Sequence, residues 1–114
     1  MWSNRRNILP LLVLLSCGTL ETALAAEPCG PRDGTLRYVD VFDGRPEELA
    51  HLVPDKANKS SGYWRLGYVY DAGRAVTIRC KYADGQASDI ELTNRVSRCD
   101  YRIDTKQTLK ISCQ

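Results

Sequence analysis

Apolar and polar residues alternate most regularly near the C-terminus, between positions 99 and 113. If the chain folds back at Lys106, three apolar pairs face each other on one side: Ile103 with Leu109, Tyr101 with Ile111, and Cys99 with Cys113. Facing residues of a non-hydrogen-bonded pair come close enough for a disulfide. The pattern therefore predicts a β-hairpin over this segment, closed by a bond between Cys99 and Cys113.

Three upstream segments are rich in β-branched and aromatic residues and predict strands: 35–42, 63–70 and 74–82. A turn at residues 71–73 would place Trp64 opposite Cys80 and keep the apolar side chains of two strands on one face. A three-residue loop at 84–86 would then pair Cys80 with Ile90 of the next strand. Together these segments predict an antiparallel meander of about five strands.

Residues 46–52 have the features of a short amphipathic helix. Pro46 suits the first helical turn, and Glu47 and Glu48 suit the positive end of the helix dipole. Apolar residues recur at helical spacing and could pack on the sheet: Leu49, Leu52 and Val53. The polar segment 55–62 predicts an exposed loop. The predicted fold class is thus α+β, a small antiparallel sheet with one short helix.

The first 25 residues have the features of an export signal. Arg5 and Arg6 precede a short apolar run at 8–15, and Ala23-Leu24-Ala25 offers small residues at the spacing of a cleavage site. The run is too short to span a bilayer as a helix. We expect a cleaved signal at 1–25 and one domain at 26–114, periplasmic or secreted. Leu14-Leu15-Ser16-Cys17 resembles a lipobox, so a lipid anchor at Cys17 is the alternative.

The cysteines outside the signal predict two disulfides. The four are Cys29, Cys80, Cys99 and Cys113, an even number in a small exported domain. Pairing Cys99 with Cys113 leaves Cys29 for Cys80, while a Cys80–Cys99 bond remains the alternative. We expect no zinc site, because the chain has no C-x-x-C pair and one histidine, and no cofactor.

The charge balance argues against nucleic acid as a partner. The chain has 16 basic and 14 acidic residues, of which Arg5, Arg6 and Glu21 lie in the signal, so 14 and 13 remain. These remaining charges form no long run of either sign. A membrane contact is expected only through the possible anchor.

No enzyme motif stands out in the sequence. There is no G-x-S-x-G, no H-E-x-x-H and no phosphate-binding glycine-rich loop. Asp43, Glu47 and His51 could in principle form a small hydrolytic site. Carboxylates at a helix start usually stabilise that helix, however, so we expect no catalytic residues.

Exposed polar and aromatic residues are the candidates for binding a protein partner. Tyr63 and Arg65 lie on the outer side of a strand, and Tyr and Arg are enriched at interfaces. The polar loop adds Lys56 and Lys59. The acidic, histidine-containing stretch before it adds Glu47, Glu48 and His51.

The sequence resembles a family of small exported bacterial proteins of uncharacterised function. The resemblance covers most of the chain from Cys29 to Cys113 and rests on these motifs: Phe42-Asp43-Gly44, Pro46-Glu47-Glu48, Leu52-Val53-Pro54-Asp55, Trp64-x-Leu66 and Cys80-x-Tyr82. It implies a periplasmic or lipid-anchored protein, and proximity of some members to type VI secretion genes implies an immunity role. The chain is also similar, more loosely, to small periplasmic lysozyme inhibitors, although their inhibitory loop motifs are not matched.

We therefore expect a non-enzymatic periplasmic binding protein. Its partner would be another protein, a secreted or periplasmic enzyme, and its role that of an inhibitor or immunity protein against a cell-wall-targeting enzyme. The alternatives are an envelope structural or assembly protein and the small hydrolase.

Overall fold

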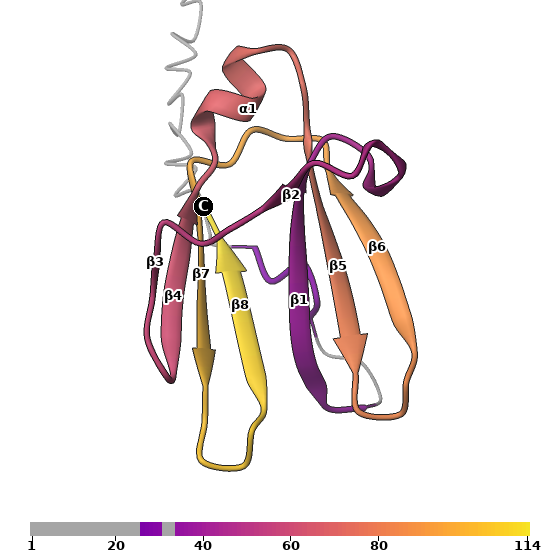
Figure 1. Ribbon diagram of the computed structural model, residues 1–114, viewed down its shortest axis with the longest axis vertical. Coiled ribbons are helices and arrows are strands. Elements are labelled where there is room, and N and C mark those ends of the chain that lie inside the picture. The colour runs from indigo at the N-terminus through magenta and orange to yellow at the C-terminus, as the bar shows by residue number, and fades with distance from the viewer. Residues whose placement is uncertain (1–25, 31–33) are drawn as a thin grey trace, which may run out of the picture.

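Four β-hairpins alternate between two antiparallel sheets in the computed structural model, which describes residues 26–30 and 34–114 (Figure 1). The first sheet has the order β2-β1-β5-β6 and the second the order β3-β4-β7-β8. The strands are β1 (Leu36–Asp43), β2 (His51–Leu52), β3 (Lys56–Ala57), β4 (Ser61–Arg65), β5 (Val76–Tyr82), β6 (Ala87–Leu92), β7 (Arg98–Ile103) and β8 (Leu109–Cys113). The predicted antiparallel β fold with one short helix is confirmed, but the single sheet is wrong, because the hairpins divide between two.

One hydrophobic core lies between the two sheets. The first sheet contributes Val41 and Ile78, and the second contributes Trp64 and Ile111, all at most 4% exposed. The β-bulge in β1 helps to fill this core. Leu36 and Val39 are three positions apart, so strict alternation could not turn both inward.

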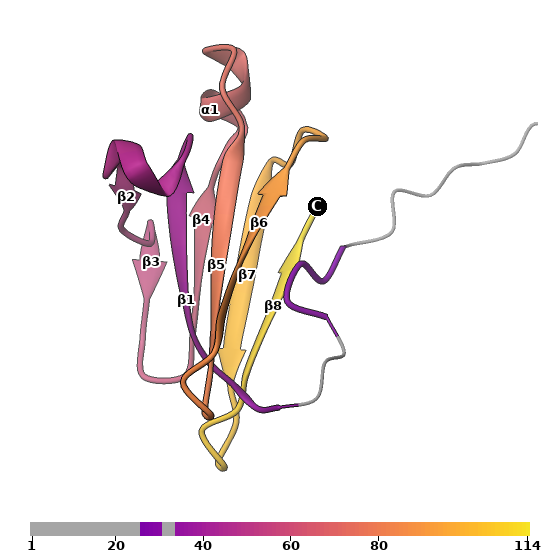
Figure 2. The ribbon, with the colours of Figure 1, turned by 90° about the vertical axis from the view of Figure 1, so that its right-hand side faces the viewer.

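Both expected disulfides are present. Cys99 bonds Cys113 within the β7–β8 hairpin, whose register is the predicted one. Cys29 bonds Cys80 and so attaches residues 26–30 to β5. These residues also run beside β8, where Ala26 and Cys113 exchange two backbone hydrogen bonds (Figure 2). The alternative Cys80–Cys99 bond is therefore wrong.

The helix predicted for residues 46–52 is wrong. Only Pro46–Glu48 form a single 3₁₀ turn, η1, and Leu49 then adopts the left-handed conformation with φ 58°. His51 and Leu52 form β2, which pairs with β1. Because residues 51 and 52 pair with β1 as a strand, burial alternates along 49–54 and does not follow a helical period. Leu49, His51 and Val53 are exposed, and the residues between them are partly buried.

The predicted strand 63–70 is wrong in its second half. It ends at Arg65, and helix α1 (Gly67–Asp71) follows, with Val69 buried and Tyr68 exposed. The expected pairing of Trp64 with Cys80 is also wrong. β4 lies in the second sheet and pairs with β7, while β5 pairs with β1 in the first.

Two loops also differ from the prediction. The loop between β5 and β6 has the expected three residues but lies one position earlier, at 83–85, so Ile90 faces Ile78 and Cys80 faces Ser88. Residues 55–60 are exposed as expected, but they contain β3, and Ser61 and Gly62 are partly buried in β4, with which β3 pairs.

The export signal and Cys17 lie outside the described residues. Within the described part of the chain, no helix has the length and apolar character needed to cross a membrane.

Candidate partner-binding face

The outer face of the second sheet, which is turned away from the core, carries a group of basic side chains. Trp64, Cys99 and Ile111 turn inward along β4, β7 and β8, so the residues next to them turn outward. We call the resulting group the basic face: Lys56, Tyr63, Arg65, Arg98, Arg102 and Lys110. Strand pairing places Lys56 beside Tyr63, Arg65 beside Arg98, and Arg102 beside Lys110.

Tyr63 lies at the centre of this face and is held by Arg98. The guanidinium carbon of Arg98 lies 3.7 Å from the centre of the Tyr63 ring, a cation–π contact. Arg98 also donates hydrogen bonds to Asp100, at 2.8 Å between Nη2 and Oδ1, and these bonds raise its pKa. Arg65 lies farther from the same ring, at 5.8 Å. The tyrosine is therefore fixed in place by a charged neighbour that is itself paired.

The other four cations of the basic face have no carboxylate within ion-pair distance among the described residues: Lys56, Arg65, Arg102 and Lys110. All four are exposed. Most of the face borders an open hollow of about 630 Å³ that reaches from Lys56 to Lys110. Asp100 and Glu27 border the same hollow, but Asp100 is paired with Arg98, so unpaired cations outnumber the acidic side chains there and favour an acidic partner surface.

The hairpin between β3 and β4 extends the positive charge. Lys59 is exposed at its tip. The side-chain oxygen of Asn58 accepts hydrogen bonds from the backbone N–H groups of Ser60 and Ser61, at 3.0 and 2.9 Å, which shapes the turn. Four of the residues expected to bind a partner thus belong to one region: Lys56, Lys59, Tyr63 and Arg65.

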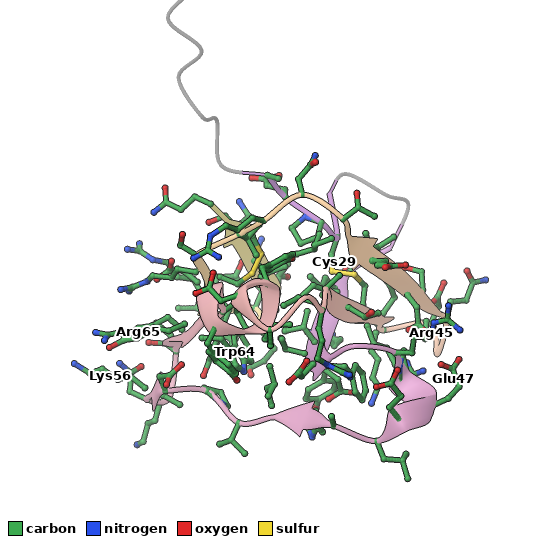
Figure 3. The ribbon with its side chains drawn as sticks, turned by 90° about the horizontal axis from the view of Figure 1, so that it is seen from above. Cys29, Arg45, Glu47, Lys56, Trp64 and Arg65 are labelled. Atoms are coloured by element: carbon green, nitrogen blue, oxygen red, sulfur yellow. A yellow bond between two sulfur atoms is a disulfide. The ribbon has the colours of Figure 1, made fainter. Side chains whose placement is uncertain are left out.

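The remaining expected contact residues lie elsewhere. Figure 3 shows Arg45 and Glu47 at one end of the molecule and Lys56 and Arg65 at the other. Glu48 accepts a hydrogen bond from Arg74, which lowers the pKa of Glu48. The sequence analysis therefore placed in one group residues that the fold separates.

His51 is part of a small packed group on the first sheet. Its ring lies 5.4 Å from that of Phe42, and its Nε2 lies 3.3 Å from Oδ1 of Asp40. The hydrolytic arrangement would require Asp43 beside it, but Asp43 accepts a hydrogen bond from Arg74 at 2.7 Å. Among the described residues, no cluster of histidine, cysteine and acidic side chains could hold a metal ion.

Sequence reasoning missed three residues of the basic face: Arg98, Arg102 and Lys110. They lie on β7 and β8, whose register was predicted correctly. Alternation along that hairpin already placed these residues opposite its apolar side. What it could not show is that β7 pairs with β4, because that contact joins distant segments.

Comparison with known proteins identifies the family. A family model described as type VI secretion system Tli immunity protein matches residues 31–114. The chain belongs to this family. No curated protein and no solved structure matches it.

Family membership decides between the functional alternatives. The chain is a non-enzymatic immunity protein against a type VI toxin effector, and its partner is that effector. The small hydrolase is thereby excluded, and in the structure His51 and Asp43 have different ion-pair partners, Asp40 and Arg74.

Proposed function

We propose that the chain neutralises its effector in the periplasm by placing the basic face on an acidic surface of the effector. The observation that carries this proposal is the group of four exposed cations without carboxylate partners around Tyr63. Arg and Tyr side chains are common anchors of protein interfaces. The two disulfides support the compartment, because such bonds persist in oxidising environments.

The effector class that we propose is a lipase. A Tle lipase would be the cognate effector of an immunity protein of the Tli family. A lipase that attacks the membrane from the periplasm would meet its inhibitor there. A cell-wall hydrolase, the partner expected from the sequence, is the alternative.

Purified proteins test both points. The probe is the cognate type VI effector, sought among the genes next to that of this chain and assayed on phospholipid vesicles and on peptidoglycan, with and without the immunity protein. Inhibited release of fatty acid supports the lipase, whereas inhibited cleavage of peptidoglycan overturns that class. Absence of binding by the unmodified chain overturns the proposed function.

Charge variants test the face. Replacing Arg65, Arg102 and Lys110 together by Gln should slow association with the effector about tenfold at low salt, because opposite charges steer the encounter. High salt should reduce the difference. Arg95→Gln is the control, since Arg95 is exposed outside the hollow and its ion pair with Asp71 is itself exposed and contributes little to stability. Equal rates for the triple variant and the control would exclude the basic face.

A further inference from the structure

Two apolar side chains project from the segment that joins the two sheets. Leu49 is 83% exposed and Val53 is 81% exposed, the highest values among the large apolar residues described. Leu49 ends the η1 turn and Val53 follows β2, with the exposed His51 between them and partly buried residues at the alternating positions. We call this pair the apolar ridge.

Leu49 has a backbone conformation that is unusual for leucine. Its φ of 58° is in the left-handed region, which glycine and asparagine occupy at low cost and other residues rarely occupy. Backbone strain of this kind is concentrated at functional sites. An exposed leucine adds nothing to the core, so its position is unexplained by folding alone.

An apolar groove lies beside the ridge. It has a volume of about 390 Å³ and passes between the sheets, with Tyr38, Leu52, Trp64 and Ile103 among its walls and Val53 at its border. Tyr38 is itself 69% exposed. Val53 and the groove therefore form one apolar surface, of the kind that marks a protein interaction site, and Leu49 projects from the same segment on the other side of His51.

Hydrogen bonds hold this surface rigid and join it to the basic face. The indole N–H of Trp64 donates to the Leu52 carbonyl at 3.2 Å. Asp55 fixes the other end, because its carboxylate accepts from the backbone N–H of Arg65 at 2.6 Å and its own N–H donates to the Tyr63 carbonyl at 2.9 Å. Residues 53–55 thus connect the ridge directly to Lys56 of the basic face. A rigid surface loses little entropy when it binds.

From these observations we infer that the apolar ridge and its groove bind an apolar segment of the same effector that the basic face contacts. The inference rests on the proposed function, since the continuity of the two surfaces identifies the occupant. Leu49 and Val53 insert into the effector, and an apolar side chain of the effector enters the groove. Charge would guide the partner to this region, and burial of apolar surface would retain it.

Leu49→Gly tests the inference with opposite expectations for binding and stability. The affinity for the cognate type VI effector should weaken, with Kd rising at least about tenfold, which corresponds to about 1.4 kcal/mol, mainly through faster dissociation. The melting temperature should stay the same or rise, because glycine accepts the left-handed conformation. Leu49→Asn keeps that conformation with a polar side chain and should weaken binding as well. Tyr68→Ala on α1 is the matched control, since Tyr68 is exposed outside the ridge and the groove.

Three results would overturn the inference. If Leu49→Gly binds within about twofold of the unmodified chain while the triple charge variant still associates slowly, the proposed function stands and the ridge has no part in it. If sedimentation shows that the unmodified chain is a dimer that Leu49→Gly separates, with effector affinity unchanged, the occupant is a second copy. If the unmodified chain binds no effector, the proposed function fails first and this inference fails with it.

Discussion

Loss of the Cys29–Cys80 bond should destabilise the protein strongly. This disulfide closes a loop of 51 residues in the unfolded chain. The chain-entropy relation gives about 4 kcal/mol for a loop of that length. Domains of this size have free energies of unfolding of roughly 5–15 kcal/mol. The bond would thus account for a large share of the free energy of unfolding.

Cys29→Ser is the variant that isolates the cross-link. Cys29 is only partly buried, so serine is tolerated there, whereas Cys80 is fully buried and keeps its sulfur in the core. Thermal unfolding followed by circular dichroism should show a fall in melting temperature of at least about 15 °C. The double variant, Cys29→Ser with Cys80→Ala, measures the added cost of the missing sulfur.

A fall of less than about 1 kcal/mol in the free energy of unfolding would refute the reasoning. It would mean that the unfolded chain is already as restricted without the bond as with it.

Two further substitutions test packing and charge. Gly62→Ala should cost about 1–3 kcal/mol in urea unfolding, because a Cβ there would lie 2.5 Å from the ring of Tyr101 and from a carbonyl of β3; an unchanged midpoint would contradict this packing. Asp89→Asn should cost less than about 1 kcal/mol at neutral pH, because its ion pair with Arg79 is partly exposed. Arg79 lowers the pKa of Asp89 below 3.8, so this contribution is present above that pH and is lost as the pH falls through the lowered pKa. The difference from the unmodified chain should therefore vanish in strong acid, and Glu91→Gln, which breaks no ion pair found in the described chain, should have little effect at any pH.

A part of the fold was predicted correctly where two independent signals in the sequence agree on the same pairing. In the C-terminal hairpin, apolar alternation and the positions of Cys99 and Cys113 select the same register. For the β5–β6 hairpin, apolar alternation is the one signal that was used to choose the register. Shifting that register by two residues keeps every side chain on the same face, so Ile90 could face Cys80 or Ile78 equally well. The structure has it opposite Ile78.

The division into two sheets could not be predicted from local patterns. Trp64, Leu66 and Val69 are all buried, which is the spacing of a strand followed by a helix. Tyr68, however, continues the alternation of Trp64 and Leu66, so the sequence alone fits one long strand as well. Only the pairing of β4 with β7 decides between them, and it joins residues about 35 positions apart. The basic face was therefore predicted in part, from the strand that carries Tyr63 and Arg65.

The stretch from Phe42 to Asp55 illustrates how one motif can have a structural and a binding role. Its inward residues have structural contacts, such as the carbonyl of Leu52, which accepts a hydrogen bond from Trp64. Its outward residues Leu49 and Val53 add little to the core, so substitution there would change the surface that a partner meets more than the stability of the fold. Because the stretch crosses between the sheets and leads into β3, the changes at its C-terminal end, such as those at Val53, act beside the basic face. An immunity protein could thus change its partner preference at these positions while its core, its disulfides and its strand pairing stay the same.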